Sequence, residues 1–230
     1  MPRAAKNRVF VVGIHNMNIA RKIVASSLMA LAALAGTAQT AQANLLNNGS
    51  FENPNRGSDT YCYMGGSCAT DSWTGGAVII AMNSGAWGWP NQPAGYAYGQ
   101  QLIGLQNSLS VSQTVSLAAG QYTLDWADSG RSTYYGSYSY GAAEYQVYFD
   151  NQLLGTYNVS PGEAWARNSL SFTASGAGEL RFQGVNLGGD TTAFVDDLRL
   201  TAAVPEPQSL AMVLLGLAVV GAVSRRKSAR

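Results

Sequence analysis

The sequence predicts an all-β fold, specifically a two-sheet jelly-roll sandwich. Three observations support this: short runs of alternating apolar and polar residues recur, turn residues separate them, and the central part of the chain has no helical periodicity. The run 109–117 is the clearest, because apolar residues occupy every second position except Gln113. About eight to ten strands are expected, a number that suits two sheets packed face to face.

The expected strands follow one another with turns between them. Gly120 turns the chain from the strand 109–117 into the strand 122–126, and Asp150-Asn151 is a two-residue hairpin turn. Tyr145, Val147 and Phe149 share one face of the strand before that turn. The remaining strands are expected at the edge segments 45–51, 78–82 and 96–105, at 153–157, around 170–172 and 180–182, and at 194–200.

The N-terminal part of the chain has the pattern of a secretory signal peptide. Arg21-Lys22 precedes an apolar stretch at 23–36, and Ala41-Gln42-Ala43 supplies the small-x-small cleavage pattern. We therefore predict a signal peptide at residues 1–43, removed by signal peptidase after Ala43. Met17 lies shortly before the basic pair and is a candidate for the true start.

The C-terminal segment 204–230 combines three features in a fixed order. Pro205-Glu206-Pro207 is followed by an apolar run at 210–223 and then by a basic end at 225–230. The run is short for a membrane helix, which needs about 20 apolar residues, and the basic end favours the cytoplasmic side. An ordinary membrane anchor after a proline-containing linker is the alternative.

The segment resembles the PEP-CTERM sorting signal of Gram-negative bacteria, with Pro205, Glu206 and Pro207 as the motif itself. The resemblance implies a hydrophobic sorting helix, a transient inner-membrane intermediate and an exosortase as processing partner. It also implies that the mature protein ends at the cell surface or in an extracellular matrix such as a biofilm.

The part between the two signals, residues 44–203, has the size of one domain. It contains five arginines and no lysine against twelve carboxylates, a net charge near −7 (5 − 12). Nucleic acid is therefore excluded as a partner, because its binding requires phosphate neutralisation by basic residues.

Histidine and cysteine restrict the chemistry further. The single histidine, His15, lies in the predicted leader, so the mature chain has no imidazole for a catalytic triad or a histidine-ligated zinc site. Cys62 and Cys68 lie in a glycine-rich loop and most simply form a disulfide in an oxidising compartment. A metal-binding or nucleophilic role for the two cysteines is the open alternative.

The mature part also resembles the galactose-binding-like jelly rolls, which include many carbohydrate-binding modules. The residues that carry this resemblance are Asn48-Gly49-Ser50-Phe51-Glu52, Trp73, 112–115, 119–124 and 194–200. By this resemblance, Glu52 and Asp196 or Asp197 would help to hold a structural calcium ion, which takes oxygen ligands.

Strand parity supports an unusual position for Asp196. Phe194, Leu198 and Leu200 are expected to face the core, and Asp196 would then point the same way, although an unpaired buried carboxylate is costly. The alternative to calcium is that these carboxylates cap backbone amides or pair with Arg199 or Arg181.

Two loop segments are rich in aromatic residues. Their candidate ligand-binding residues are Trp87, Trp89, Tyr134, Tyr135 and Tyr138, together with Arg131. Aromatic rings stack on sugars, but the same composition also suits loop packing or protein contacts. Trp73, Trp126 and Trp165 lie in or beside strand patterns and are expected in the core or the sheets.

The sequence thus predicts a non-catalytic module that binds extracellular polysaccharide or other envelope components. The alternative is a structural or adhesive matrix protein with no discrete sugar site. Glycosidases use two carboxylates at a defined separation, and no motif singles out such a pair among the acidic residues.

Overall fold

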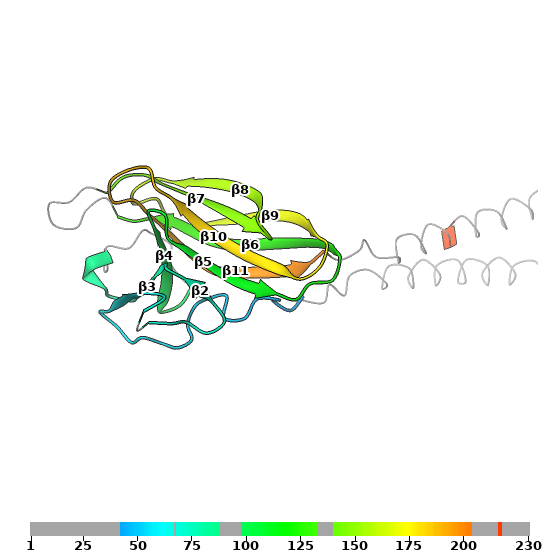
Figure 1. The fold of residues 1–230 in the computed structure, drawn as a ribbon, viewed down its shortest axis with the longest axis horizontal. Helices are drawn as coiled ribbons and strands as arrows, with labels where there is room; N and C mark the ends of the chain where they lie inside the picture. The colour runs from blue at the N-terminus through cyan, green and yellow to red at the C-terminus, as the bar shows by residue number, and fades with distance from the viewer. Residues whose placement is uncertain (1–41, 67, 88–97, 133–139, 204–215, 218–230) are drawn as a thin grey trace, which may run out of the picture. The chain divides into compact units, whose positions relative to one another are not determined.

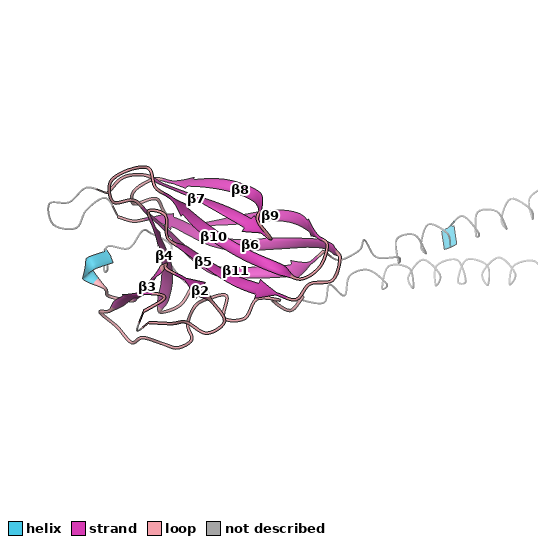
Figure 2. Cartoon of the chain, in the orientation of Figure 1, coloured by secondary structure: helices cyan, strands magenta, loops and turns pink. Residues whose placement is uncertain are grey.

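The computed structural model describes residues 42–66, 68–87, 98–132, 140–203 and 216–217. Residues Gln42–Ala203 form one compact unit. This unit is an all-β sandwich of two antiparallel sheets, which confirms the predicted jelly-roll class (Figures 1 and 2).

Eleven strands make up the two sheets among the described residues. The six-stranded sheet has the order β1-β3-β4-β11-β6-β9, and the five-stranded sheet has the order β2-β5-β10-β7-β8. From β5 to β7 and from β8 to β11 the chain crosses to the other sheet at each connection. The strands are β1 (Tyr61–Tyr63), β2 (Thr74–Gly75), β3 (Val78–Ala81), β4 (Gln101–Gln106), β5 (Ser110–Val115), β6 (Gly120–Gly130), β7 (Ala143–Phe149), β8 (Gln152–Val159), β9 (Ala166–Ala174), β10 (Gly178–Val185) and β11 (Thr192–Ala202).

The β7–β8 hairpin forms as predicted. Asp150 and Asn151 both have positive φ angles, 46° and 65°, and Phe149 pairs with Gln152 across the turn. Asparagine and aspartate tolerate this left-handed conformation, which matches the turn to the twist of the two strands.

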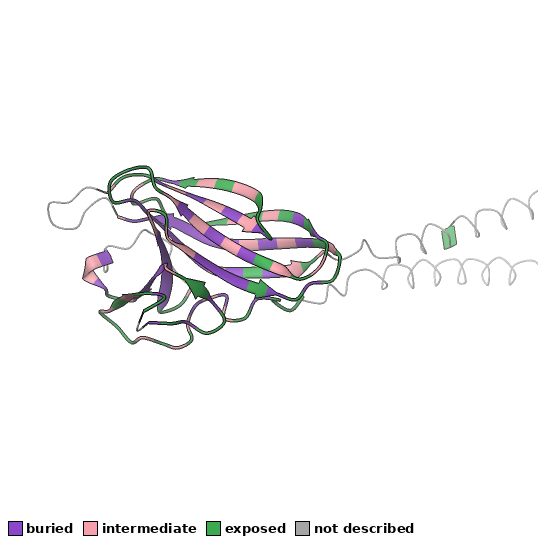
Figure 3. Ribbon diagram, in the orientation of Figure 1, coloured by how far each residue is buried: buried purple, intermediate pink, exposed green. Residues whose placement is uncertain are grey.

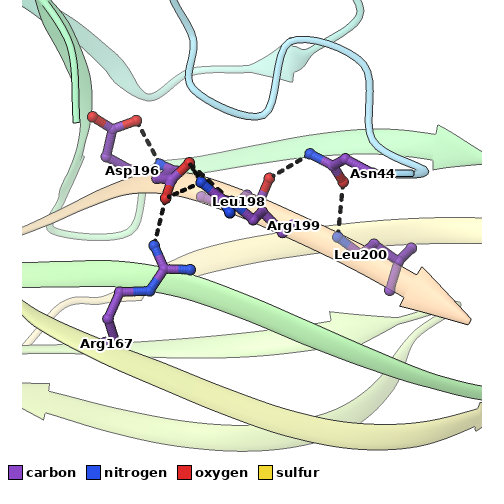
Figure 4. Close-up of polar contacts among 7 residues, drawn as sticks. Asn44, Arg167, Asp196, Leu198, Arg199 and Leu200 are labelled. Carbon is purple, nitrogen blue, oxygen red and sulfur yellow. Dashed lines mark hydrogen bonds and ion pairs between the residues drawn. The ribbon is translucent and has the colours of Figure 1, made fainter. Parts of the chain in front are cut away.

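The predicted edge strand at 45–51 is wrong. These residues form turns that hydrogen-bond along the end of β11: the Leu45 amide donates to the Leu200 carbonyl (2.8 Å) and the Leu198 amide donates to the Gly49 carbonyl (2.8 Å). The Asn44 side chain holds the same stretch of β11, donating to the Leu198 carbonyl and accepting from the Leu200 amide (Figure 4). Positive φ angles at Asn48 and Phe51 break the extended backbone that a strand needs.

The sequence did not predict β1 and β2. They contain three and two residues, which is too short for an alternating pattern to stand out.

The main core lies between the sheets. Trp126 of β6 sits at its centre, with its indole ring against Tyr157 and Phe182 of the opposite sheet. The Trp126 indole N–H donates to the Tyr145 hydroxyl (2.7 Å), which donates to the Asp128 carboxylate (2.6 Å). This buried chain joins β6 to β7, and therefore one sheet to the other.

A second apolar cluster covers part of the outer face of the six-stranded sheet, over β3 and β4 and the adjoining parts of β6 and β11. Val78, Ile80, Leu102, Ala127 and Phe194 contribute from four strands. Trp87, from the 3-10 turn η1 (Gly85–Trp87), and Trp165 pack against them from loops. We call this group the outer cluster. The buried positions of Trp73, Trp126 and Trp165 agree with the sequence prediction.

A β-bulge in β11 corrects the parity argument for Asp196. The register shifts between Asp196 and Arg199, and Asp197 has a positive φ of 49°. Phe194 therefore belongs to the outer cluster, whereas Leu198 and Leu200 face the main core. Asp196 pairs with Ala127 of the outer cluster, so it shares the face of Phe194 and not that of Leu198.

Both predicted export segments fall mainly outside the described residues, including the motif Pro205-Glu206-Pro207 and the basic end. Within the described part of the chain, no helix is long and apolar enough to span a membrane.

Candidate functional site

Arg131, the residue directly after β6, is the centre of a group of aromatic side chains. Its guanidinium lies 4.3 Å from the ring centroid of Trp87 and 3.6 Å from that of Tyr140. The same guanidinium donates to the Ala86 carbonyl (2.7 Å) and pairs with the Asp190 carboxylate (3.0 Å). Arginine stacked between rings is held firmly, because cation–π attraction adds to its hydrogen bonds.

Two tyrosines of β1 extend this group to the surface. Tyr61 and Tyr63 pair with Ile80 and Val78 of β3 and so lie on the face of the outer cluster. Their side chains are 43% and 45% exposed, and the Tyr61 ring contacts Trp87 edge-on with centroids 5.6 Å apart. We call Tyr61, Tyr63, Trp87, Arg131 and Tyr140 the aromatic cluster.

The disulfide predicted between Cys62 and Cys68 is present, with the two Cα atoms 5.9 Å apart. Cys62 lies between the two tyrosines and packs against the main core, since neighbouring residues of a strand point to opposite faces. The disulfide and the pairing with β3 together fix this short edge strand, and with it the direction of both tyrosine rings.

A chain of polar contacts connects the surface to the buried arginine. The Tyr63 hydroxyl donates to Gln106 (2.8 Å), and the Gln106 amide donates to Asp190 (2.8 Å), which pairs with Arg131. Partial burial raises the pKa of Tyr63, with smaller contributions from Tyr61 and Asp190. The hydroxyl is therefore neutral at physiological pH and keeps its proton for donation.

The predicted ligand-binding residues divide into two groups. Trp87 and Arg131 belong to the cluster but are only 3% and 6% exposed, so they support the surface rather than form it. Trp89, Tyr134, Tyr135 and Tyr138 lie outside the described residues. Tyr61 and Tyr63 were missed, although the sequence Tyr-Cys-Tyr, with a cysteine between two exposed rings, was the available signal.

The candidate calcium ligands all have protein partners. The Glu52 carboxylate accepts from the backbone amides of Gln100 (2.6 Å) and Gln101 (3.0 Å) and thus caps the start of β4. Asp196, which is fully buried, accepts from the Asp197 amide (2.6 Å).

Asp197 carries the bulge and pairs with two arginines. Its carboxylate lies 2.6 Å from Arg167 and 3.2 Å from Arg199, in the region drawn in Figure 4. These contacts match the alternative to calcium given above, in which the carboxylates cap backbone amides or pair with arginines. Arg167 is a partner that the sequence analysis did not name. Arg181 pairs with Glu179 instead.

The described residues contain no group of three or more carboxylate, histidine or cysteine side chains able to hold a metal ion. The side chains therefore do not form a calcium cage by themselves, and calcium stays a prediction.

The comparison with protein families found a match at the C-terminal end of the sequence. A family model described as the PEP-CTERM protein-sorting motif matches residues 203–227. The chain carries a PEP-CTERM sorting motif. This motif indicates export with processing by an exosortase, in agreement with the interpretation of Pro205-Glu206-Pro207. A comparison with curated proteins found no match.

Several solved structures are similar to this chain at a low level. The carbohydrate-binding module TmCBM61, solved with β-1,4-galactotriose, is 16% identical, with 70% of this chain and 99% of that chain covered and a TM-score of 0.40. A CBM36 module with calcium and xylotriose is 17% identical, covering 43% and 79%, with a TM-score of 0.36. The xylan-binding CBM22-1 domain of Paenibacillus barcinonensis Xyn10C is 11% identical, covering 73% and 99%, with a TM-score of 0.42. At this level of similarity, function has to be argued from the side chains of the present chain.

Proposed function

We propose that this protein is an exported, non-catalytic polysaccharide-binding protein of the cell surface or extracellular matrix. The observation that carries the proposal is the pair of half-exposed tyrosine rings held beside the buried Arg131 network. Sugar rings offer C–H groups to the electron-rich face of an aromatic ring and hydroxyl groups to neighbouring polar atoms. The aromatic cluster supplies both kinds of contact.

The two tyrosine rings define the shape of this surface. Their centroids lie 6.3 Å apart and their planes meet at 79°, so they form a corner rather than a flat platform. A corner accommodates a bend or an end of a flexible glycan better than the flat face of a crystalline polymer.

The cluster is also pre-organised. The disulfide, the β1–β3 pairing and the bond from Tyr63 to Gln106 hold the rings before any ligand arrives. Because less side-chain freedom is lost on binding, more of the contact energy appears as affinity.

The charges favour a neutral glycan. Arg131 is the only cation of the aromatic cluster, and its charge is balanced by Asp190 at 3.0 Å. The part 44–203 as a whole carries twelve carboxylates against five arginines, which disfavours polyanionic chains. We therefore propose neutral extracellular polysaccharide as the partner.

The proposal is tested with residues 42–203, which contain both apolar clusters and therefore a complete core of their own. Binding to purified exopolysaccharide, xylan and β-1,4-galactan is measured by affinity electrophoresis and calorimetry. Tyr61→Ala and Tyr63→Ala are each expected to weaken binding by about tenfold, the loss of roughly 1.4 kcal/mol. Leu45→Ala is the control. Leu45 is 41% exposed like the two tyrosines, but its backbone amide bonds to Leu200 of β11 and it is not part of the aromatic cluster.

Two results would contradict this function. A folded domain that binds none of these polymers would favour the structural or adhesive matrix protein. New reducing ends in polysaccharide incubated with the domain would show that the protein is an enzyme.

Calcium is the remaining part of the proposal. An ion held by Glu52 and Asp196 with backbone carbonyl groups would tie the N-terminal turns to β11, and chelation would then lower the melting temperature. The effect of calcium at 100 times its Kd would be about 2.7 kcal/mol. The measurement is thermal unfolding in calcium and in EDTA, and an unchanged melting temperature would rule the ion out.

A further inference from the structure

The outer face of the five-stranded sheet carries a continuous set of polar side chains. Along β7 and β10, residues alternate between full burial and partial exposure, as the colours of these strands show (Figure 3). The outward residues of these strands and of β5 include one tyrosine, one arginine and several amides and hydroxyls. We call their polar members the polar face: Ser110, Ser112, Thr114, Glu144, Gln146, Tyr148, Glu179, Arg181 and Gln183.

The centre of the polar face is a stacked pair. The Arg181 guanidinium lies 4.4 Å from the ring centroid of Tyr148, its partner across the β10–β7 pairing. Arg181 also donates to Gln183 (2.8 Å), and the Tyr148 hydroxyl donates to Gln146. These contacts fix the orientation of four neighbouring side chains, although a guanidinium has five N–H donors and retains some for a ligand.

A hollow continues the polar face at the edge of the sheet. It has a volume of about 400 Å³ and is lined by Asn47, Ser72, Trp73, Thr74, Ser112, Gln113 and Thr114. Ser112 is the cross-strand neighbour of Arg181, so the hollow leads directly to the stacked pair. Its volume falls within the range typical of small-ligand sites, and hydroxyl groups dominate its lining.

The chemistry of this surface selects its partner. Among its described residues, the polar face has one arginine and two glutamates. Glu179 lies 3.6 Å from Arg181, and Glu144 adds a second negative charge, so the face has no positive excess to attract a polyanion. Its side chains are mainly hydroxyls and amides, whereas the core of a protein interface is mainly apolar. Hydroxyl and amide groups around one stacked aromatic ring match the hydroxyl-rich surface of a neutral sugar chain.

We infer that the polar face is a second glycan-binding surface, which takes an extended neutral polysaccharide lying across strands β2, β5, β10 and β7. With strands about 4.8 Å apart, the path from the hollow to Tyr148 is roughly 14 Å long, enough for several sugar units. The two outer faces of a sandwich point in opposite directions, so this surface is separate from the aromatic cluster. One domain can therefore hold two polysaccharide chains and cross-link them.

The test compares the two surfaces in the same domain, residues 42–203. The variants are Tyr148→Ala/Arg181→Ala for the polar face, Tyr61→Ala/Tyr63→Ala for the aromatic cluster, and Thr173→Ala, an exposed residue of β9, as control. Hexasaccharides of xylan and of β-1,4-galactan are titrated by calorimetry. Turbidity with long-chain xylan, galactan and exopolysaccharide reports cross-linking.

Wild type and the control are expected to bind two hexasaccharides per domain and to make long chains turbid. Each double variant should bind one and lose the turbidity at least tenfold. Tyr148→Phe, which keeps the ring but not the bond to Gln146, should weaken the polar-face site with less risk to folding. Unchanged thermal unfolding establishes that each variant is folded.

The experiment distinguishes a failure of this inference from a failure of the proposed function. A stoichiometry of one in the wild type, unaffected by the Tyr148 variants and abolished by the Tyr61/Tyr63 variant, overturns the second surface alone. Loss confined to the Tyr148 variants supports the polar face and contradicts the aromatic cluster. No binding of any neutral glycan contradicts both.

Discussion

The outer faces of the two sheets are built on different plans. On the six-stranded sheet, Trp87 and Trp165 cover a second apolar cluster that includes Val78, Ile80 and Phe194. On the five-stranded sheet, the outward side chains of β5, β7 and β10 are mainly polar and include the Arg181–Tyr148 pair, and the exposed Leu153 of β8 pairs with Tyr148. Loops therefore close the β3–β4 part of one face, whereas β9 of the same sheet and the outer face of the five-stranded sheet are left open to solvent or a ligand.

This difference shows that the sequence of a strand indicates whether its outer face is covered by other parts of the chain. All four residues of β3, Val-Ile-Ile-Ala, are buried, as expected for a strand with apolar contacts on both faces. In β7, Ala-Glu-Tyr-Gln-Val-Tyr-Phe alternates between buried and partly exposed residues, as expected for a strand with one open face. Continuous apolar strands thus mark the covered face, and alternating strands mark the open one.

The largest loss of stability is expected when a side chain that covers the six-stranded sheet is removed. Trp87→Ala removes a buried ring and the support of Arg131, and should lower the free energy of unfolding by about 3–5 kcal/mol. Tyr148→Ala, its counterpart on the open face, should cost less than about 1 kcal/mol, because the Tyr148 ring is only partly buried. Urea unfolding of both variants checks the contrast, and similar losses would contradict it.

A smaller effect on stability is expected from the buried hydrogen-bond chain of Trp126, Tyr145 and Asp128, which joins the two sheets. Burial raises the pKa of Asp128 above its ordinary value of 3.8, and this is partly opposed by the hydrogen bond from the Tyr145 hydroxyl. The folded state then holds this proton more tightly than the unfolded state. The stability contributed by Asp128 is therefore complete below 3.8 and is lost as the pH rises through its folded pKa.

Asp128→Asn keeps an oxygen acceptor for the Tyr145 hydroxyl but cannot titrate. At neutral pH the variant should be at least as stable as the wild type, and the difference should shrink as the pH falls towards 3.8. Thermal unfolding across this pH range provides the measurement. A constant difference at all pH values would mean that Asp128 does not titrate in this way.

Sequence reasoning succeeded where a local pattern decides the structure. Alternation located β5 and β7, the Asp150-Asn151 pair specified the hairpin, and the oxidising compartment predicted the Cys62–Cys68 disulfide. It failed at Asp196, because a bulge at Asp197 reverses which face the following residues occupy. It also missed Tyr61 and Tyr63, because a strand of three residues has too few alternations to be recognised.

The sequence by itself determined the all-β class, the acidic character of the domain and the sorting motif, which depend on composition and on residues close together in the chain. Only the tertiary structure decided which aromatic rings reach the surface. Trp87 is buried beside Arg131 while Tyr61 remains half exposed, although both come from loop-rich segments. Exposure depends on what packs from distant parts of the chain, and no short stretch of sequence contains that information.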